Sequence, residues 1–436
     1  MKIVLKDGYI VDPAGKNDGN GDVIIDNGRI TGIRMSANAS QAKKADTDGA
    51  FVIYAKGLLI TPGLVDMHAH LREPGFEHKE TIETGSAAAI EGGFTAVCCM
   101  PNTNPVNDSA EVTSYILNKA KEASSCKVFP IGAITKGQLG NELVDFDALR
   151  KAGCVAFSDD GRPVMNSLLM RQALEYSKAS GITIIAHEED IYLAEGGVMN
   201  EGKVSQSLAF KGIPAAAEEI MIARDIILAG LTGGRLHIAH VSTKGAVELI
   251  RRAKNDGIAI TAETCPHYFS ITEEAAETMG TAAKVNPPLR TADDVAAIRE
   301  GLSDGTIDVI ATDHAPHHKD EKALGFDKAP FGISGLETAL GLSMSLVHEG
   351  VLTIGQLVEK MSVNPSRILG LDRGALTEGS EGDILIMDAD KEWVVKPEDF
   401  VSLGKNTPFS GRRLKGRPVM VISGGEIFDM QDRKAL

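Results

Sequence analysis

The sequence lacks an apolar run long enough to cross a membrane. No uninterrupted apolar stretch among its 436 residues approaches the roughly 20 residues that a transmembrane helix needs. The first residues, MKIVLKDGYIVDPAG, also lack the apolar core and cleavage signal of a secretory signal peptide. We therefore expect a cytoplasmic protein with no membrane partner.

Cysteine is scarce, and the cysteines show no pattern that would build a scaffold. Their number is odd, and their spacing contains neither CxxC nor a zinc-finger arrangement of Cys and His. A disulfide framework is thereby excluded, and small buried thiols in a reducing compartment are the expected state. The five are Cys98, Cys99, Cys126, Cys154 and Cys265.

Basic residues are outnumbered by acidic ones. Lys and Arg total 45 against 60 Asp and Glu, which gives a formal net charge of −15. The basic surface that nucleic acids require is therefore missing, and we expect no nucleic-acid partner. A local positive site for a small anionic substrate remains compatible with this total, because the field near a metal ion is set locally.

Short apolar runs alternate with polar loops and helical stretches from about residue 60 onward. Strands alternating with helices indicate right-handed βαβ units and a parallel sheet. Eight such runs predict a closed (β/α)₈ TIM barrel, whereas a doubly wound sheet would call for a Gly-rich dinucleotide motif after the first strand, and none is present. The runs are LLITPGLVDMHAH, FTAVCCMPN, KVFPIGAIT, GCVAFSDDG, ITIIAHEED, RLHIAHVS, IAITAETCPHY and DVIATDHAPH.

Both ends of the chain have a different, β-rich character. KIVLKDGYIVD and GDVIIDNGRITGI near the start resemble GDILIMDADKEWVV and GRPVMVISGGEIFDM near the end. Because chain termini often lie close together, the two ends are expected to form one small β-sandwich. We thus predict a barrel over residues 61–370, flanked by sandwich segments 1–60 and 371–436.

Polar side chains recur at the carboxyl ends of the predicted strands. In an extended strand residues two apart share a face, so His68, His70 and Arg72 are expected to project together. In a barrel all carboxyl ends meet on one face, where active sites are built. The others are Asn102, Asp159, Asp160, His187, His240, Asp313 and His317.

Four histidines with two carboxylates suit a metal of the Zn²⁺, Mn²⁺ or Co²⁺ type. Two ions held close together would make hydroxide available at neutral pH and polarise a carbonyl group. Asp313, after the eighth strand, is placed to carry the proton to a leaving nitrogen. The predicted reaction is hydrolysis of an amide-like bond or its reverse. His237 and the remaining histidines are interpreted as structural, and Asp66 and Glu73 as groups that orient the histidines or the loop.

Several motifs together resemble the amidohydrolase superfamily, and among its cyclic-amide hydrolases the bacterial class I dihydroorotases. The motifs are DMHAHLREPG, MPNT, FSDDG, AHEED, IAHVS, ETCPHY, VNPPLR, ATDHAPH and FGISGLET, and they cover most of the barrel. This resemblance implies reversible cyclisation of N-carbamoyl-L-aspartate to L-dihydroorotate in de novo pyrimidine (UMP) biosynthesis. It also implies two Zn²⁺ ions per subunit, a homodimer, and an aspartate transcarbamoylase as a candidate partner.

The resemblance assigns roles residue by residue. Asp313 is the implied catalytic acid and base, and Arg72 is the guanidinium that holds the substrate carboxylate. The implied metal ligands are His68, His70, Asp160, His187, His240 and Asp313. The implied substrate-binding residues are His70, Arg72, Asn102, Asn286, His317, Phe331 and Gly332.

Three questions stay open at this point. The fourth strand, VAFSDDG, offers no lysine to bridge two metals, so an aspartate is expected instead, either Asp159 or, as the resemblance favours, Asp160. Residues 317–332 could form a lid or only a surface loop. Alternative functions are another cyclic-amide hydrolase of the allantoinase or hydantoinase kind, which Arg72 argues against, and a non-catalytic dihydroorotase-like scaffold.

Overall fold

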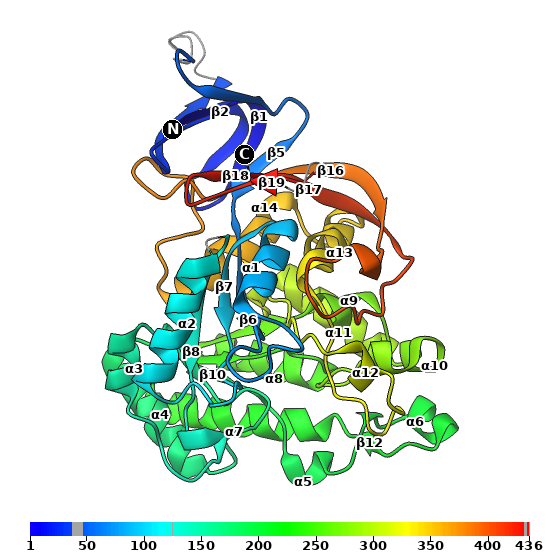
Figure 1. Ribbon diagram of the computed structural model, residues 1–436. Helices are drawn as coiled ribbons and strands as arrows, with labels where there is room; N and C mark the ends of the chain where they lie inside the picture. The colour runs from blue at the N-terminus through cyan, green and yellow to red at the C-terminus, as the bar shows by residue number, and fades with distance from the viewer. Residues whose placement is uncertain (37–46, 124, 431–433, 436) are drawn as a thin grey trace.

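The computed structural model describes residues 1–36, 47–123, 125–430 and 434–435. It contains a nearly closed barrel of eight parallel strands and a sheet formed by both ends of the chain, which lies above the barrel in Figure 1. The predicted fold class is confirmed, while the division of the chain at residues 60 and 370 stays a prediction. Within the described residues no helix combines the length and the apolar character needed to span a bilayer.

All eight predicted apolar runs form strands of the barrel, in chain order. The first and last strands meet where Ala69 bridges His314 and the His70 amide donates to the His314 carbonyl at 2.8 Å. Every residue of the first two strands is buried, as expected for parallel strands that are covered on both faces. The strands are β6 (Leu64–Ala69), β7 (Phe94–Cys99), β8 (Lys127–Gly132), β9 (Ala156–Ser158), β10 (Thr183–Ala186), β13 (Leu236–Ile238), β14 (Ile260–Thr264) and β15 (Val309–Ile310).

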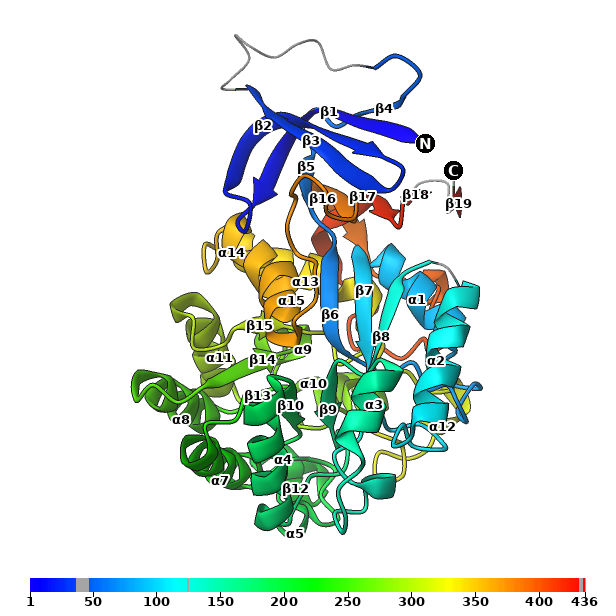
Figure 2. The ribbon, with the colours of Figure 1, turned by 90° about the vertical axis from the view of Figure 1, so that its left-hand side faces the viewer.

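Helices follow the strands and surround the barrel (Figure 2). Thr81 and Thr291 each begin a helix through a reciprocal capping box, and Gly181 ends one in the left-handed conformation, at φ 73°. The longer helices are α1 (Ile82–Glu91), α2 (Ala110–Ala123), α3 (Phe146–Ala152), α4 (Ser167–Ser180), α7 (Ala216–Thr232), α8 (Lys244–Asn255), α11 (Ala292–Asp304) and α13 (Leu336–His348). Short elements are α5 (Ile191–Ala194), β11 (Met199–Asn200), α6 (Lys203–Leu208), β12 (Gly212–Ile213), α9 (Pro266–Ser270), α10 (Ala275–Met279) and α12 (Lys319–Lys322).

The end of the barrel at which the strands begin is closed by a helical segment that follows α13 in the chain. It comprises α14 (Ile354–Val358), a π-helical turn (Glu359–Val363) and α15 (Asn364–Leu369). Thr183, at the start of β10, donates its hydroxyl to the Ile368 carbonyl at 2.8 Å. The carboxyl ends of the strands, where the polar residues lie, are therefore at the opposite end.

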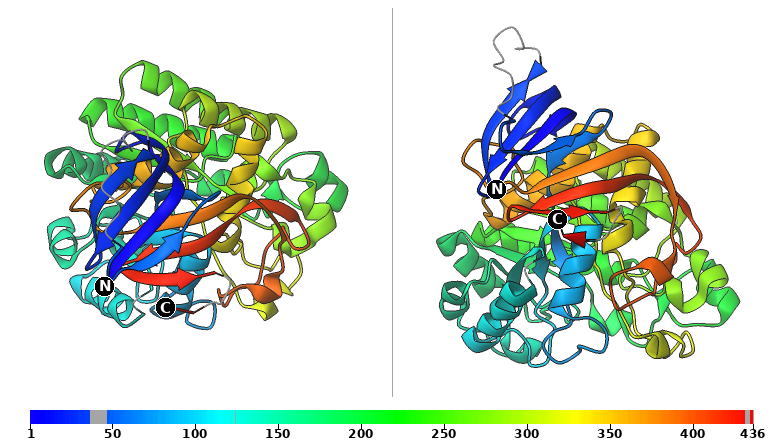
Figure 3. Two further views of the ribbon diagram at one scale, coloured as in Figure 1. Left: turned by 90° about the horizontal axis from the view of Figure 1, so that it is seen from above. Right: turned by 45° about the horizontal axis from the view of Figure 1, so that its top comes forward.

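The terminal segments share one sheet and one hydrophobic core. Strands from the two ends meet where β5 pairs with β16, with Ile60 opposite Ile386, and Figure 3 shows the two sets side by side. Ile3, Ile25 and Ile422 lie in the same buried cluster, so the sheet folds over a core that both ends supply. Its strands are β1 (Lys2–Asp12), β2 (Asn17–Asp26), β3 (Arg29–Met35), β4 (Phe51–Tyr54), β5 (Leu59–Pro62), β16 (Ile384–Val394), β17 (Arg413–Ser423), β18 (Glu426–Asp429) and β19 (Lys434–Ala435).

Candidate active site

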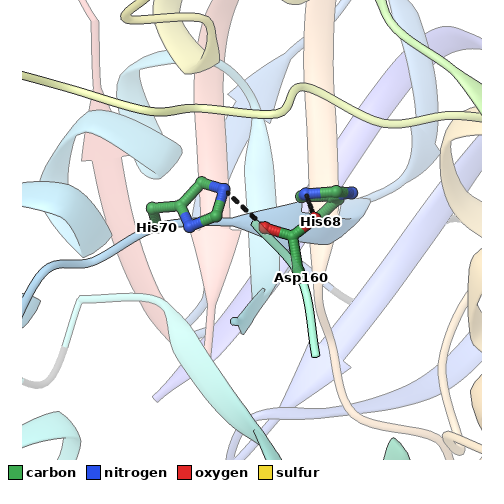
Figure 4. Close-up of side chains that lie close together, drawn as sticks. All are labelled: His68, His70 and Asp160. Atoms are coloured by element: carbon green, nitrogen blue, oxygen red, sulfur yellow. Dashed lines mark ion pairs between the residues drawn. The ribbon is translucent and has the colours of Figure 1, made fainter. Parts of the chain in front are cut away.

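Four buried histidines surround one carboxylate at the carboxyl ends of the barrel strands. His68 lies on β6 and His70 directly follows it, and Asp160, His187 and His240 follow β9, β10 and β13. Figure 4 shows the first pair facing Asp160. Asp160 Oδ1 lies 3.5 Å from His68 Nε2, 3.3 Å from His187 Nδ1 and 3.4 Å from His240 Nε2, and its Oδ2 lies 3.4 Å from His70 Nε2.

Hydrogen bonds behind the first two histidines determine which ring nitrogens face the carboxylate. His68 Nδ1 lies 2.5 Å from Glu263 Oε1, and His70 Nδ1 lies 2.8 Å from Asn102 Oδ1. A carboxylate and an amide oxygen only accept, so both Nδ1 atoms carry the proton. Both Nε2 atoms then present lone pairs toward Asp160, which is the arrangement of metal-binding histidines oriented from behind.

The donor set fits metal ions. Two groups, His68–His70–Asp160 and Asp160–His187–His240, each bring donor atoms within 4.8 Å of one another, and Asp160 is common to both. His68 Nε2, His187 Nε2 and His240 Nδ1 are buried without a hydrogen-bond partner among the described residues. Of these three, His68 Nε2 faces Asp160, and its lone pair and the carboxylate repel each other in a buried site unless a cation lies between them. Imidazole with carboxylate suits Zn²⁺.

Asp313 joins the same cluster from the end of β15. Its Oδ1 lies 3.2 Å from His70 Nε2 and 3.6 Å from His68 Nε2. Burial opposes ionisation, but the neighbouring His70 and the other nearby histidines hold the pKa of this carboxyl below its usual value. Asp313 and His240 both have left-handed backbones, with φ of 44° and 34°, a strained state that is concentrated at functional sites.

Asp159 points away from this cluster. Its Oδ1 accepts from the backbone amides of Ile134 and Thr135 at 2.8 and 3.1 Å, and its Oδ2 accepts from the Thr135 hydroxyl. Burial raises its pKa to about 6. Asp159 therefore anchors the loop after β8, and the carboxylate that faces the four histidines belongs to Asp160.

Arg72 lies beside this cluster of histidines and carboxylates, two residues after His70, where the chain has left β6. β6 ends at Ala69, and Arg72 has a left-handed φ of 61°, so the expected alternation along one strand stops before it. Its Nε donates to the Pro316 carbonyl at 3.2 Å, and no carboxylate of the described residues lies within 4.0 Å of its guanidinium. Burial lowers its pKa to about 10, so Arg72 stays charged at neutral pH with terminal N–H groups available to an anion.

The other predicted substrate residues surround Arg72 and the cluster. His317 Nε2 lies 3.3 Å from Arg72 Nη2 and 2.7 Å from the Phe331 carbonyl oxygen. Gly332 has φ 127°, and a Cβ added there would lie 3.2 Å from His317 Nε2. Asn286 donates to Glu189 Oε1 at 3.1 Å. The Asn102 side-chain oxygen is engaged with His70, and a role of this residue in binding substrate stays a prediction.

Sequence reasoning missed Glu263 and Lys79, and it gave His237 only a structural role. Glu263 is fully buried and also lies 3.2 Å from His237 Nε2, so His237 supports the carboxylate that orients His68. Burial would raise the pKa of Glu263, but His68 and His237 hold it well below its usual range. No sequence signal marks this contact, because His68 and Glu263 lie on different strands far apart in the chain.

Asp66 and Glu73 support the backbone rather than the imidazoles. Asp66 accepts from the Thr312 amide at 3.0 Å and from the His68 amide at 3.3 Å, which ties β6 to the end of β15. Glu73 accepts from the Ile82 amide at 2.9 Å and holds the loop before α1. The predicted orienting role of both residues therefore applies to the loops.

Two buried lysines hold the segment 317–332. Lys322 Nζ donates to the carbonyls of Pro330 and Gly332, each at 3.0 Å. Lys284 Nζ donates to the Phe326 and Ala329 carbonyls, each at 2.6 Å. These bonds fix the segment against the barrel, and its closure as a lid stays a prediction.

Known proteins resemble this chain in both sequence and structure. A family model described as Dihydro-orotase-like matches residues 57–246. A protein from Pelotomaculum thermopropionicum named Dihydroorotase is 54% identical over 434 residues, which cover 99% of each chain. One of the same name from Syntrophus aciditrophicus is 52% identical, covering 99% of this chain and 100% of the relative.

Solved structures resemble the fold over its whole length. The L-hydantoinase (dihydropyrimidinase) of Arthrobacter aurescens superposes with a TM-score of 0.86 at 26% identity, covering 100% of this chain and 97% of the other. This similarity places the barrel and the terminal sheet among hydantoinase-type amidohydrolases. Full-length identity above half to proteins named Dihydroorotase is a far closer relationship, and on this ground the chain belongs to the dihydroorotase family.

Proposed function

We propose that the protein is a dihydroorotase that interconverts N-carbamoyl-L-aspartate and L-dihydroorotate in pyrimidine biosynthesis. The observation that carries this proposal is a charged Arg72, without a carboxylate partner among the described residues, beside a cluster with the donor set of a metal site. Dihydroorotate has a carboxylate that does not react, next to the cyclic amide that does. A guanidinium can hold that carboxylate through two parallel hydrogen bonds while the amide reaches the cluster.

We propose two Zn²⁺ ions as the metals. His68 and His70 would hold one ion and His187 and His240 the other, with Asp160 shared between them. When bound, such ions act as Lewis acids toward a carbonyl oxygen and lower the pKa of water. The imidazole orientations that this requires are supported by the contacts of Glu263 and Asn102 behind the rings.

Asp313 is the proposed acid and base. Hydrolysis of dihydroorotate breaks the ring C–N bond, forms a C–O bond from water, and moves one water proton to the leaving nitrogen. A single carboxylate beside the reacting atoms can accept that proton and return it. Asp313 lies at the edge of the cluster, ionised, with His70 as its nearest partner. The reverse reaction follows the same proton path.

Arg72 and His317 are the proposed grip on the substrate carboxylate, with Asn286 and the Phe331–Gly332 turn next to the ring. His317 and Arg72 present nitrogen atoms 3.3 Å apart, at the side of the cluster where the loops after β6 and β15 meet. The Arg72 N–H groups beside His317 can donate to a carboxylate oxygen. An uncharged cyclic amide would leave the Arg72 guanidinium without a charged acceptor, which argues for dihydroorotate over hydantoin or allantoin.

We further propose a cytoplasmic homodimer, with an aspartate transcarbamoylase as a candidate partner. Ile220, Ile227 and Leu231 on one side of α7 are 51%, 69% and 65% exposed, and Tyr192 on the neighbouring α5 is 76% exposed. Apolar side chains gathered on adjacent helices are typical of a protein interface. Sedimentation of the wild type and of Ile227→Glu tests the dimer, since a charge at that surface is expected to favour the monomer.

The decisive experiment is hydrolysis of L-dihydroorotate by the purified protein, with Zn²⁺ and with a chelator, beside Arg72→Ala. We expect turnover by the wild type, its loss with chelator, and a large rise in KM for the variant. Hydantoin and allantoin serve as uncharged comparison substrates. Turnover of these but not of dihydroorotate would refute the assignment in favour of another cyclic-amide hydrolase. Metal binding without any turnover would indicate the scaffold alternative.

A further inference from the structure

Lys79, on the loop between β6 and α1, contacts His317, which with Arg72 forms the proposed binding site for the substrate carboxylate. Its Nζ is 3.3 Å from His317 Nδ1 and 3.1 Å from Glu321 Oε1. The side chain is only 15% exposed, so the ammonium group is held in place between these two partners. Lys79 touches none of the proposed metal ligands at these distances, so any effect it has on the site passes through His317 or Glu321.

The contacts of His317 select one tautomer. Its Nε2 lies 2.7 Å from the Phe331 carbonyl oxygen, which can only accept a hydrogen bond, so Nε2 must carry a proton. Lys79 can only donate, so Nδ1 must offer its lone pair to the ammonium group. The opposite tautomer would set an Nδ1–H against the Lys79 ammonium and two lone pairs against each other at Phe331.

A doubly protonated His317 is disfavoured by its surroundings. Burial and the positive charges of Arg72 and Lys79 lower its pKa to about 2. One carboxylate faces the ring, Glu321, whose Oε2 lies 3.5 Å from Nδ1 while its Oε1 is paired with Lys79. Lys322 adds a further repulsive charge from α12. The ring is therefore neutral, and its one proton resides on Nε2.

This tautomer determines whether His317 and Arg72 form a hydrogen bond with each other. His317 Nε2 and Arg72 Nη2 lie 3.3 Å apart, and both are donors, so they do not bond to each other. The single Nε2 proton is already donated to the Phe331 carbonyl, so His317 neither donates to Arg72 nor accepts from it, and the Arg72 Nη2 N–H groups stay available to a carboxylate. With the other tautomer, His317 would accept from Arg72 and occupy one of its N–H groups.

We propose that Lys79 is a positioning residue of the substrate carboxylate site, acting through His317. By donating to Nδ1 it keeps the Nε2 proton on the Phe331 carbonyl, so that Nε2 has no lone pair for Arg72 and the Arg72 N–H groups stay free for the carboxylate. Lys79 also joins the loop after β6 to α12 through Glu321. This inference rests on the proposed function, since it assigns a task in binding the same carboxylate.

The test compares Lys79→Met with the wild type in dihydroorotate hydrolysis. Loss of one hydrogen bond to a fixed donor site is expected to raise KM by about tenfold, with kcat changed by less than about twofold. Lys319→Met removes an exposed lysine from the neighbouring α12 and is the matched control for a simple loss of charge. We expect its KM to stay at the wild-type value.

Chemical rescue of the Lys79 variant distinguishes a positioning role of the ammonium group from a general effect on folding. Lys79→Cys treated with bromoethylamine restores an ammonium group on a side chain of nearly the same length, and the five native cysteines are all buried. We expect this treatment to recover the wild-type KM, with treated wild type as the control. In protein labelled with ¹⁵N-histidine, His317 is expected to show an Nε2–H signature in the wild type and a mixture of tautomers in Lys79→Met.

The outcomes separate this inference from the proposed function. If the wild type hydrolyses dihydroorotate and Lys79→Met matches it in KM and in the ¹⁵N spectrum, the role of Lys79 is wrong while the function stands. A fall in kcat with unchanged KM, or no recovery after aminoethylation, would also overturn it. If the wild type has no dihydroorotate activity the proposed function fails, and the spectrum alone still decides whether Lys79 fixes the tautomer.

Discussion

Replacing Glu263 by Gln should weaken metal binding without touching a proposed ligand. Glu263 holds His68 Nδ1 at 2.5 Å and His237 Nε2 at 3.2 Å, and it is fully buried. Gln keeps the size of the side chain but removes the negative charge and gives one of the two histidines an NH₂ group in place of an oxygen. His68 would lose the partner that keeps its Nε2 deprotonated and directed toward Asp160.

The magnitude follows from the position of this contact. Carboxylates behind a metal-binding histidine are worth about 10–100-fold in metal affinity or activity when mutated. This corresponds to about 1.4–2.7 kcal/mol of binding free energy. The short distance to His68 and the complete burial of Glu263 place the expected loss at the upper end of that range.

The assay is competition for Zn²⁺ between the protein and a chromophoric chelator, read beside kcat. Glu273→Gln is the matched control, because Glu273 is also buried but accepts from the Asn200 side-chain amide at 2.6 Å, and neither residue belongs to the cluster. We expect Zn²⁺ affinity to fall in Glu263→Gln and not in Glu273→Gln. Wild-type affinity in Glu263→Gln, or equal losses in both variants, would refute the orienting role.

Three further predictions concern the proton path, the substrate loop and the core. Asp313→Asn should lower kcat by about 10²–10⁴-fold and leave KM for dihydroorotate within a few-fold, as steady-state kinetics would show. Gly332→Ala forces a Cβ into a left-handed backbone, 2.6 Å from the Ala315 carbonyl oxygen and 3.2 Å from His317 Nε2, so thermal unfolding should report a loss of about 1–3 kcal/mol and kinetics a higher KM. Burial lowers the pKa of Lys360 from 10.5 to about 8, so the unfolded state binds more protons between these values. Chemical denaturation should therefore show wild-type stability rising relative to Lys360→Met from pH 8 to 10.5, and a constant difference would contradict this.

The barrel was predictable because most of its strands are buried on both faces. Runs such as FTAVCC have no polar face to show, and the polar loops between them mark the ends of the strands. The convergence of His68, His187 and His240 follows once the eight runs form one barrel, since all their carboxyl ends lie on one face. Which atoms hold a metal, and which residues bind substrate, remain predictions.

Three features could not be derived from local pattern. Strand periodicity predicts that Arg72 continues the alternation of His68 and His70, but the chain turns at Arg72 into a left-handed conformation. Glu263 and Lys79 gain their contacts from elements far away in the sequence, His68 on one strand and His317 after another. A single sequence gives residue types and spacing, whereas such contacts depend on how the loops pack.

The strand β5 couples the folding of the terminal sheet to the folding of the barrel. It runs through Pro62 toward Leu64, where β6 and its histidines begin, and Ile60 pairs with Ile386 near the end of the chain. Closing this loop of roughly 320 residues is entropically costly and slow, so we expect the terminal sheet to complete last during folding. During synthesis, the edge of β5 that pairs with β16 stays unpaired until the ribosome has released the end of the chain. In pulse-labelled hydrogen exchange, the Ile60 amide should then become protected later than the amides of β7 and β8. A chaperone that binds this edge would be needed for longer than one that binds the barrel strands.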